Sequence, residues 1–170
     1  CSIRYCDLSG ARLRETKIDV SSFNYVSITD ADLVGVRLSK SHLNMTNFEG
    51  SNLNGGKYDR SGFDRVDFTK AKLTGANFGN CELSFCTFND TNLSLAQFGG
   101  SKLLNVTMLN CDAPGFSANS TDFVEFIAVS CNFAESEVVR SSLIEARLRK
   151  SDLSHIDLTG SKLDNADLRE

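Results

Sequence analysis

The chain has 170 residues with a formal net charge of −4, and 41% of its residues are apolar. This length and apolar content are sufficient for one domain with a buried core, and the net negative charge disfavours direct binding to DNA or RNA. No run of about 18 apolar residues is present, so we expect no membrane span.

Large apolar residues recur every five residues along the whole chain. The position two residues before each of them is small almost everywhere, and the other three positions are polar or glycine. This period matches neither a helix, at about 3.6 residues, nor a strand, at about two. It predicts a backbone that turns a corner every five residues and points one large and one small side chain inward. The large residues begin with Ile3, Leu8, Leu13 and Ile18 and end with Leu153, Leu158, Leu163 and Leu168, and only Ala113, Ala118 and Ala128 among them are small.

The repeat is clearest in AKLTG followed by ANFGN (Ala71 to Asn80), in SDLSH (Ser151 to His155) and in ADLRE (Ala166 to Glu170). It resembles the pentapeptide-repeat family, and the resemblance covers the entire chain. The resemblance implies an all-β fold, a right-handed quadrilateral β-helix in which four units form the four sides of each coil. Coils of about 20 residues would give about 8.5 coils and a rod about 40 Å long. We expect one domain over 1–170, a fragment or domain of a longer protein because the chain begins at Cys1 without a methionine.

Residues 1–70 are the less regular part of the repeat, with Val26, Val36 and Val66 at the usually small position. Glycines recur at one place in the unit, at multiples of one coil. We expect them to line one edge of the rod, where glycine permits a corner with positive φ. They are Gly35, Gly55, Gly75 and Gly115.

Phenylalanines accumulate in the most regular stretch, 71–103, and just before it. One coil separates Phe48, Phe68 and Phe88, and one coil separates Phe78 from Phe98. We predict two aromatic ladders in the core, because every one of these residues is the large residue of its unit. Burial of each ring contributes about 1.5–3 kcal/mol.

The sequence is most irregular over 104–130. Ala118 and Ala128 are undersized, but Phe116 and Phe126 stand two residues before them and conserve the core volume. Ala113 has no such partner and precedes Pro114 directly. We therefore expect a bulge or distortion at that place. A domain boundary is not expected, because the five-residue phase continues without insertion or deletion.

All six cysteines occupy the small inward position, where Ala, Ser, Thr and Val also occur. None has a CxxC spacing, and His42 and His155 are predicted to face outward, so no metal site is expected. Cys111 and Cys131 should stack in neighbouring coils, close enough for a disulfide, but a reduced row of small fillers is the preferred interpretation. It places the protein in a reducing compartment: the cytoplasm, or the host cytosol for a secreted effector. The cysteines are Cys1, Cys6, Cys81, Cys86, Cys111 and Cys131.

Motifs that carry chemistry are absent from the sequence. It contains no phosphate-binding loop, nucleophile elbow or zinc-protease motif, and its carboxylates follow the repeat. We therefore expect no catalytic residues, no cofactor and no enzymatic activity.

One of the four sides has a net positive charge, and cations repeat on it at one-coil intervals. Like charges about 5 Å apart repel each other, so such a row could be maintained for an anionic partner. The alternative, which we prefer, is an ordinary solvated face, because Asp19 and Asp59 lie among the cations. The candidate anion-contact residues are Lys17, Arg37, Lys57, Lys40 and Arg60.

A second feature of the surface is an apolar stripe with the same one-coil repeat. Single exposed apolar residues carry no information, but a repeating stripe indicates an interface. It is either a contact face for another protein or a face covered by flanking segments of a longer chain, and the end coils could be capped by such segments or by another copy. The candidate stripe consists of Tyr5, Tyr25, Met45 and Phe85 in one row and Leu104, Val124 and Ile144 in the next, with Leu109, Ile127 and Val129 on the neighbouring side.

Two functions remain. The first is a rigid, non-enzymatic scaffold for protein–protein interaction, a module of a larger bacterial protein such as a secreted effector. The second, implied by resemblance to quinolone-resistance determinants, is a DNA mimic that binds DNA gyrase or topoisomerase. Three features disfavour mimicry: bases are interleaved with the acids on every side, no loops interrupt the coil, and no dimerising helix precedes Glu170.

Overall fold

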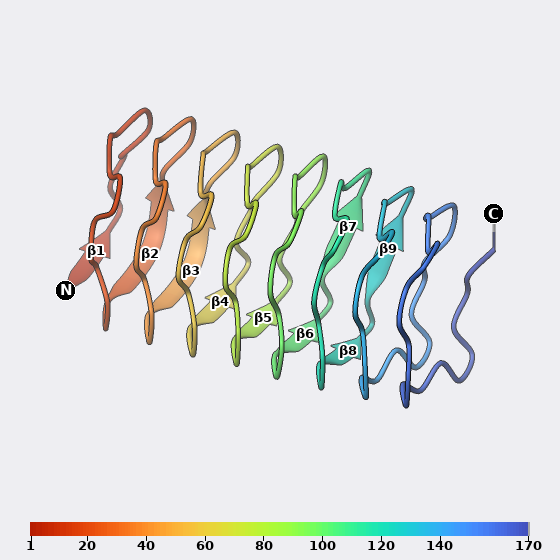
Figure 1. Cartoon of the computed structure of the whole chain (residues 1–170). Helices are drawn as coiled ribbons and strands as arrows, with labels where there is room; N and C mark the ends of the chain where they lie inside the picture. The colour runs from red at the N-terminus through yellow and green to blue at the C-terminus, as the bar shows by residue number, and fades with distance from the viewer. Residues whose placement is uncertain (170) are drawn as a thin grey trace.

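The structure, a computed structural model, describes residues 1–169. The chain winds into stacked coils along one axis, with the N-terminus at one end of the rod and the later coils following in sequence order (Figure 1). Every pairing is parallel and joins residues 20 positions apart, from Ser2 with Ser22 to Arg147 with Asp167. No helix occurs in 1–169. The prediction of an all-β quadrilateral β-helix is confirmed.

In the described residues 1–169, regular strands form on two sides of the coil and not on the other two. On the first of these sides seven coils carry a strand, which is fewer than the predicted total of about 8.5 coils. Beyond β8 the same side continues through isolated bridges. The larger sheet contains β1 (Ser2–Arg4), β2 (Ser22–Ser27), β3 (His42–Asn47), β4 (Gly62–Asp64), β5 (Glu82–Ser84), β6 (Lys102–Leu104) and β8 (Asp122–Val124), and the smaller one contains β7 (Thr107–Leu109) and β9 (Ile127–Val129).

Every fifth residue from Tyr5 to Asn165 forms a corner with positive φ. The predicted edge of glycines is present, with φ of 68° at Gly35 and 65° at Gly55. Glycine is not required for the corner, however, because 25 corners have a side chain. A left-handed conformation costs such a residue about 1–2 kcal/mol. Ladder hydrogen bonds offset this cost: the Phe85 corner N–H, for example, donates to the Leu104 carbonyl at 2.9 Å.

The aromatic ladders lie in the core. Phe68 stacks on Phe48 and Phe88 with ring centroids 5.3 and 4.7 Å apart, and Phe78 stacks on Phe98 at 4.7 Å. The two ladders meet edge to face, as between Phe78 and Phe88 at 84°. All five rings are fully buried. The ladders therefore fill the core of these coils.

The predicted bulge at Ala113 to Gly115 is wrong. Asp112 bridges both neighbouring coils, and the Pro114 carbonyl accepts a bond of 3.0 Å from the Leu95 N–H. Proline is tolerated because the N–H at this position of the unit takes no part in the hydrogen bonds between coils. At the equivalent position one coil later, the Ala134 N–H donates to the Asn132 side chain instead. The volume compensation holds, since Phe116 and Phe126 are buried beside the small alanines.

Candidate protein-contact corner

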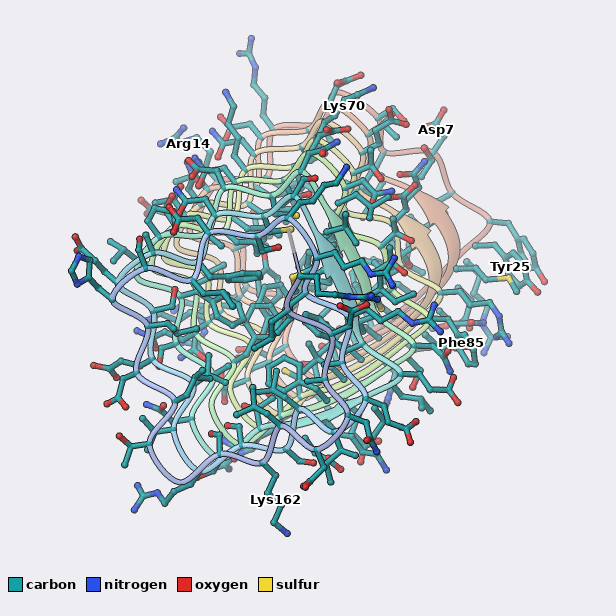
Figure 2. The ribbon with its side chains drawn as sticks, turned by 90° about the vertical axis from the view of Figure 1, so that its right-hand side faces the viewer. Asp7, Arg14, Tyr25, Lys70, Phe85 and Lys162 are labelled. Carbon is teal, nitrogen blue, oxygen red and sulfur yellow. The ribbon has the colours of Figure 1, made fainter. Side chains whose placement is uncertain are left out.

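One corner of the rod presents five large side chains to solvent, one per coil. We call it the aromatic corner: Tyr5, Tyr25, Met45, Arg65 and Phe85. The four apolar members have exposed fractions of 79, 49, 38 and 49% in that order. In Figure 2, which looks along the rod, Tyr25 and Phe85 project outward from the same corner. The left-handed backbone directs these side chains away from the core, whereas the large residue of each unit points inward.

Neighbouring members of the aromatic corner order one another. The rings of Tyr5 and Tyr25 stack at 5.3 Å with an interplanar angle of 12°. The Arg65 guanidinium lies 5.3 Å from the centre of the Phe85 ring and pairs with Asp64 at 2.6 Å. Side chains that are already ordered lose less entropy on binding a partner, and Tyr, Arg, Met and Phe are enriched in protein interfaces. Sequence analysis missed Arg65, although its one-coil spacing from Met45 and Phe85 is the signal that includes it.

The remainder of the predicted stripe is less accessible. Leu104 and Val124 are half-buried in β6 and β8, and only Ile144 is exposed, at 39%. On the neighbouring side Leu109, Ile127 and Val129 are also half-buried. In these coils the aromatic corner is continued by polar residues: Asn105, Glu125 and Glu145. The structure therefore restricts the prominent apolar surface of this corner to the first five coils.

A shallow groove lies on the β1–β6 side, directly beside the aromatic corner. It is lined by Tyr25, His42, Met45, Arg65 and Glu82, among others. At its middle Gly62 carries no side chain, and a Cβ there would lie 2.9 Å from His42 Nδ1. The groove gives the contact region both a raised edge and a hollow, which favours a shaped partner surface over nonspecific apolar contact.

Three other large apolar residues are exposed among residues 1–169, and sequence analysis did not predict their exposure: it left Val20 and Leu95 unmentioned and wrongly placed Leu168 inward. Val20 and Leu95 are corner residues exposed by 69 and 61%, and Leu168 belongs to the last coil at 43%. The five-residue period could have identified Val20 and Leu95 as outward corner residues, because both lie in the same phase as Tyr5 and Tyr25. Neither has an apolar neighbour in its own row, where Lys40 and Gly115 follow. They are isolated, and they provide matched controls for the aromatic corner.

The apolar core is incompletely covered at its C-terminal end. Leu153, Leu158 and Leu163 are half-buried, and together with Leu168 they line an apolar cavity. Covering of an end coil, by flanking segments or by another copy, therefore stays a prediction.

The cationic row has the predicted register, but part of its charge is neutralised. Arg37 bridges Lys17 and Lys57 through the backbone, and its guanidinium pairs with Asp19 at 2.9 Å. Lys40 and Arg60 occupy the adjacent corner, and Asp59 accepts a 2.6 Å hydrogen bond from Ser39 between them. Both acids lie inside the row, which reduces its attraction for an anion. We therefore retain the interpretation of a solvated face with mixed charge.

The cysteines have a hydrogen-bonding role that sequence analysis missed. A serine at the small position donates to the carbonyl 23 residues earlier, as Ser61 does to Leu38 at 2.8 Å, and Cys81 donates in the same way to Tyr58 at 3.0 Å. Burial raises the pKa of Cys81 and of Cys86 to about 12. The neighbouring Cys131 sulfur and burial raise the pKa of the Cys111 thiol. In the described part of the chain all six thiols are free, and only Cys1 and Cys6 are exposed.

Within residues 1–169, no group of three or more His, Cys, Asp or Glu side chains is arranged to hold a metal ion. Over the same residues, no helix has the length and hydropathy needed to cross a bilayer. Acids and bases also pair across coils, as in Lys70 with Glu49 at 3.2 Å and Arg14 with Asp32 at 3.1 Å. The negative charge of the surface is therefore locally compensated rather than continuous.

The fold and the aromatic corner define a parallel β-solenoid repeat protein with exposed aromatic side chains on one edge. The family model of pentapeptide repeats matches residues 21–55, 63–100 and 141–170 in 8 copies. The chain belongs to the pentapeptide-repeat family.

Three solved structures are similar to this chain, and the first of them shares its fold. HetL, a pentapeptide repeat protein involved in heterocyst differentiation regulation in the cyanobacterium Nostoc, is 22% identical with a TM-score of 0.51, over 98% of this chain and 84% of HetL. A pentapeptide repeat protein from the Arabidopsis thaliana thylakoid lumen is 18% identical with a TM-score of 0.41, over 63 and 64% of the two chains. QnrB1, a plasmid-mediated fluoroquinolone resistance protein, is 14% identical with a TM-score of 0.40, over 96 and 90%. No curated protein matches the sequence.

Proposed function

We propose that the protein is a rigid, non-enzymatic scaffold that binds another protein through the aromatic corner, as a module of a larger bacterial protein such as a secreted effector. The observation that carries the proposal is the run of exposed Tyr, Met, Arg and Phe side chains at one-coil intervals. The bacterial and effector setting is supported by the family resemblance alone.

Rigidity supports a scaffold role. The coils are joined by parallel ladders along the rod, and the core contains stacked rings. Residues of the aromatic corner are therefore held at a spacing of about 4.8 Å per coil. A surface that does not reorganise on binding avoids part of the entropy cost of association.

DNA mimicry is the second candidate, and likeness to QnrB1 at 14% identity does not support it beyond the fold. A mimic needs dense and continuous negative potential along the rod. Here 22 acidic residues are mixed with 18 basic ones. Ion pairs such as Glu49 with Lys70 neutralise part of the side that carries Asp67 and Asp90. These observations favour the interaction scaffold.

The test replaces Tyr25, Met45 and Phe85 together by Ser and measures partner binding by the immobilised chain. A protein captured by the wild-type chain is accepted as a partner of the aromatic corner only if it fails to bind this variant and still binds a Leu95→Ser control. Binding should be lost by the triple variant while its circular dichroism stays that of a β-structure, because the three side chains point outward. Equal binding to the triple variant and the control would contradict the proposal.

A gyrase assay separates the two candidates. The purified chain should fail to inhibit gyrase supercoiling at about micromolar concentration, because its acids are interleaved with bases. Potent inhibition that disappears with Glu49→Gln, Asp67→Asn and Asp90→Asn, and survives the aromatic-corner substitutions, would favour mimicry instead.

A further inference from the structure

We infer that the partner of the aromatic corner is a second copy of this chain, packed antiparallel about a twofold axis at Met45. The inference rests on the proposed function, because it assigns a partner to the same surface. It arises from the order of the side chains along the corner, which is nearly the same when read from either end.

The aromatic corner has a ring at each end and Met45 in the middle, with one residue per coil between them. An antiparallel twofold axis exchanges coils at equal distances on either side of the axis. With the axis at Met45, Tyr5 faces Phe85 of the second copy, Tyr25 faces Arg65, and Met45 faces itself. Every contact outside the axis occurs twice.

Each of these pairs is chemically favourable. Tyr5 and Phe85 form a ring pair, and Arg65 meets the Tyr25 ring as a cation on an aromatic face. The two Met45 side chains are flexible and can fill the space on the axis. Arg65 already lies over the Phe85 ring of its own chain. The guanidinium is therefore positioned among rings before the second copy arrives.

Other arrangements of the same corner are less favourable. A parallel pair would place Arg65 against Arg65, two like charges in contact. An antiparallel pair centred on Phe85 would oppose Tyr25 to Glu145 and Met45 to Glu125, which puts carboxylates against apolar surface. Among antiparallel axes, the one at Met45 gives all five members of the aromatic corner a partner that is apolar or is a cation that binds rings.

The adjacent row of side chains is compatible with this register. With the axis at Met45, Arg4 of one copy faces Ser84 of the other, next to Glu82. Arg4 and Glu82 are both exposed, and neither has an ion-pair partner among the described residues. Asp64 faces Asn24, so no like charges meet across this row. The polar flank therefore does not oppose the register of the aromatic corner.

The contact covers the first five coils along one edge of the rod. Such an edge buries less than the roughly 1,200–2,000 Å² of a standard specific interface, so the dimer should dissociate at about micromolar concentration. The later coils extend past the partner on both sides.

Cysteine cross-linking tests the axis directly in the full chain. In a Cys1→Ser, Cys6→Ser background, Met45→Cys should form a disulfide-linked dimer on mild oxidation, because both thiols lie on the axis. Leu95→Cys, on another edge and exposed by 61%, is the matched control and should cross-link far more slowly. Tyr5→Cys should cross-link with Phe85→Cys in a mixture and much less with itself. Cross-linking at Met45→Cys no faster than at Leu95→Cys would overturn the inference.

Sedimentation equilibrium supplies the second measurement. The wild-type chain should be dimeric at about 100 micromolar, and Met45→Glu should raise the dissociation constant at least about tenfold without changing the circular dichroism. A monomeric wild-type chain would overturn the inference. If the monomer still binds a different protein through the aromatic corner, the proposed function stands and only this partner assignment fails.

Discussion

At the residue scale, Tyr58 is the most unusual side chain of the core. It is fully buried, and its hydroxyl has no hydrogen-bond partner among residues 1–169. Gly56 makes room for it: a Cβ at Gly56 would lie 2.2 Å from the hydroxyl oxygen. The five-residue pattern predicts that Tyr58 points inward, but it contains no information on the hydroxyl, because hydrogen-bond satisfaction depends on residues in other coils.

Tyr58→Phe should stabilise the protein by about 1–3 kcal/mol, because a buried hydroxyl without a partner is removed and the ring stack on Phe78 is kept. Urea unfolding measures this change. Gly56→Ala is the companion variant and should destabilise through the clash with the hydroxyl. A stability loss in Tyr58→Phe would mean that the hydroxyl has a partner in solution.

The buried thiols predict a dependence of stability on alkaline pH. The pKa of Cys81 and Cys86 is raised from 9.0 to about 12, so the unfolded chain loses these protons first as pH rises. Their contribution to stability is complete below pH 9 and declines as pH rises through the interval up to about 12. Cys81→Ser should reduce that alkaline loss, because serine does not ionise there and donates the same hydrogen bond. An identical alkaline slope in the variant would contradict this.

At the element scale, the repeat unit explains which parts of the fold could be predicted from sequence. Phe48, Phe68 and Phe88 occur in one phase with one-coil spacing, so their stacking follows from the pattern. The corners could not be predicted fully, because Tyr25 and Phe85 adopt a left-handed conformation that propensity assigns to glycine. The prediction of a bulge at Ala113 to Gly115 was wrong. It took the uncompensated small Ala113 and the following proline as signals, whereas the decisive fact is that the backbone position of Pro114 needs no N–H donor.

A single unit offers a paired stability test. Phe68→Ala removes a ring from the middle of a ladder and should destabilise by about 3–5 kcal/mol. Lys70→Ala, two residues later and outward, should change stability by no more than about 0.5 kcal/mol, because its pairing with Glu49 is exposed. Thermal or urea unfolding measures both. Equal losses would contradict the assignment of inward and outward positions.

At the scale of the whole molecule, the backbone of the rod is regular, whereas the distribution of exposed apolar side chains on its surface is not. The backbone repeats the same corner from Tyr5 to Asn165, but exposed aromatic rings gather on one edge of the first five coils. Sequence analysis located Tyr5, Tyr25, Met45 and Phe85 because the period defines which residues share a row. It overestimated the exposure of Leu104 and Val124. These residues lie next to each other in the paired strands β6 and β8, and the sequence pattern alone contains no information on how far neighbouring coils cover a side chain.

The accessibility of the three tyrosines tests the contact role of the aromatic corner most directly. Iodination or hydroxyl-radical footprinting should modify Tyr5 and Tyr25 in the free chain and leave Tyr58 unmodified, because Tyr58 is fully buried. In the complex that the chain forms, with itself or with another protein, Tyr5 and Tyr25 should become protected while Leu95 stays reactive to radicals. Unchanged modification of Tyr5 and Tyr25 in an assembled complex would contradict the account.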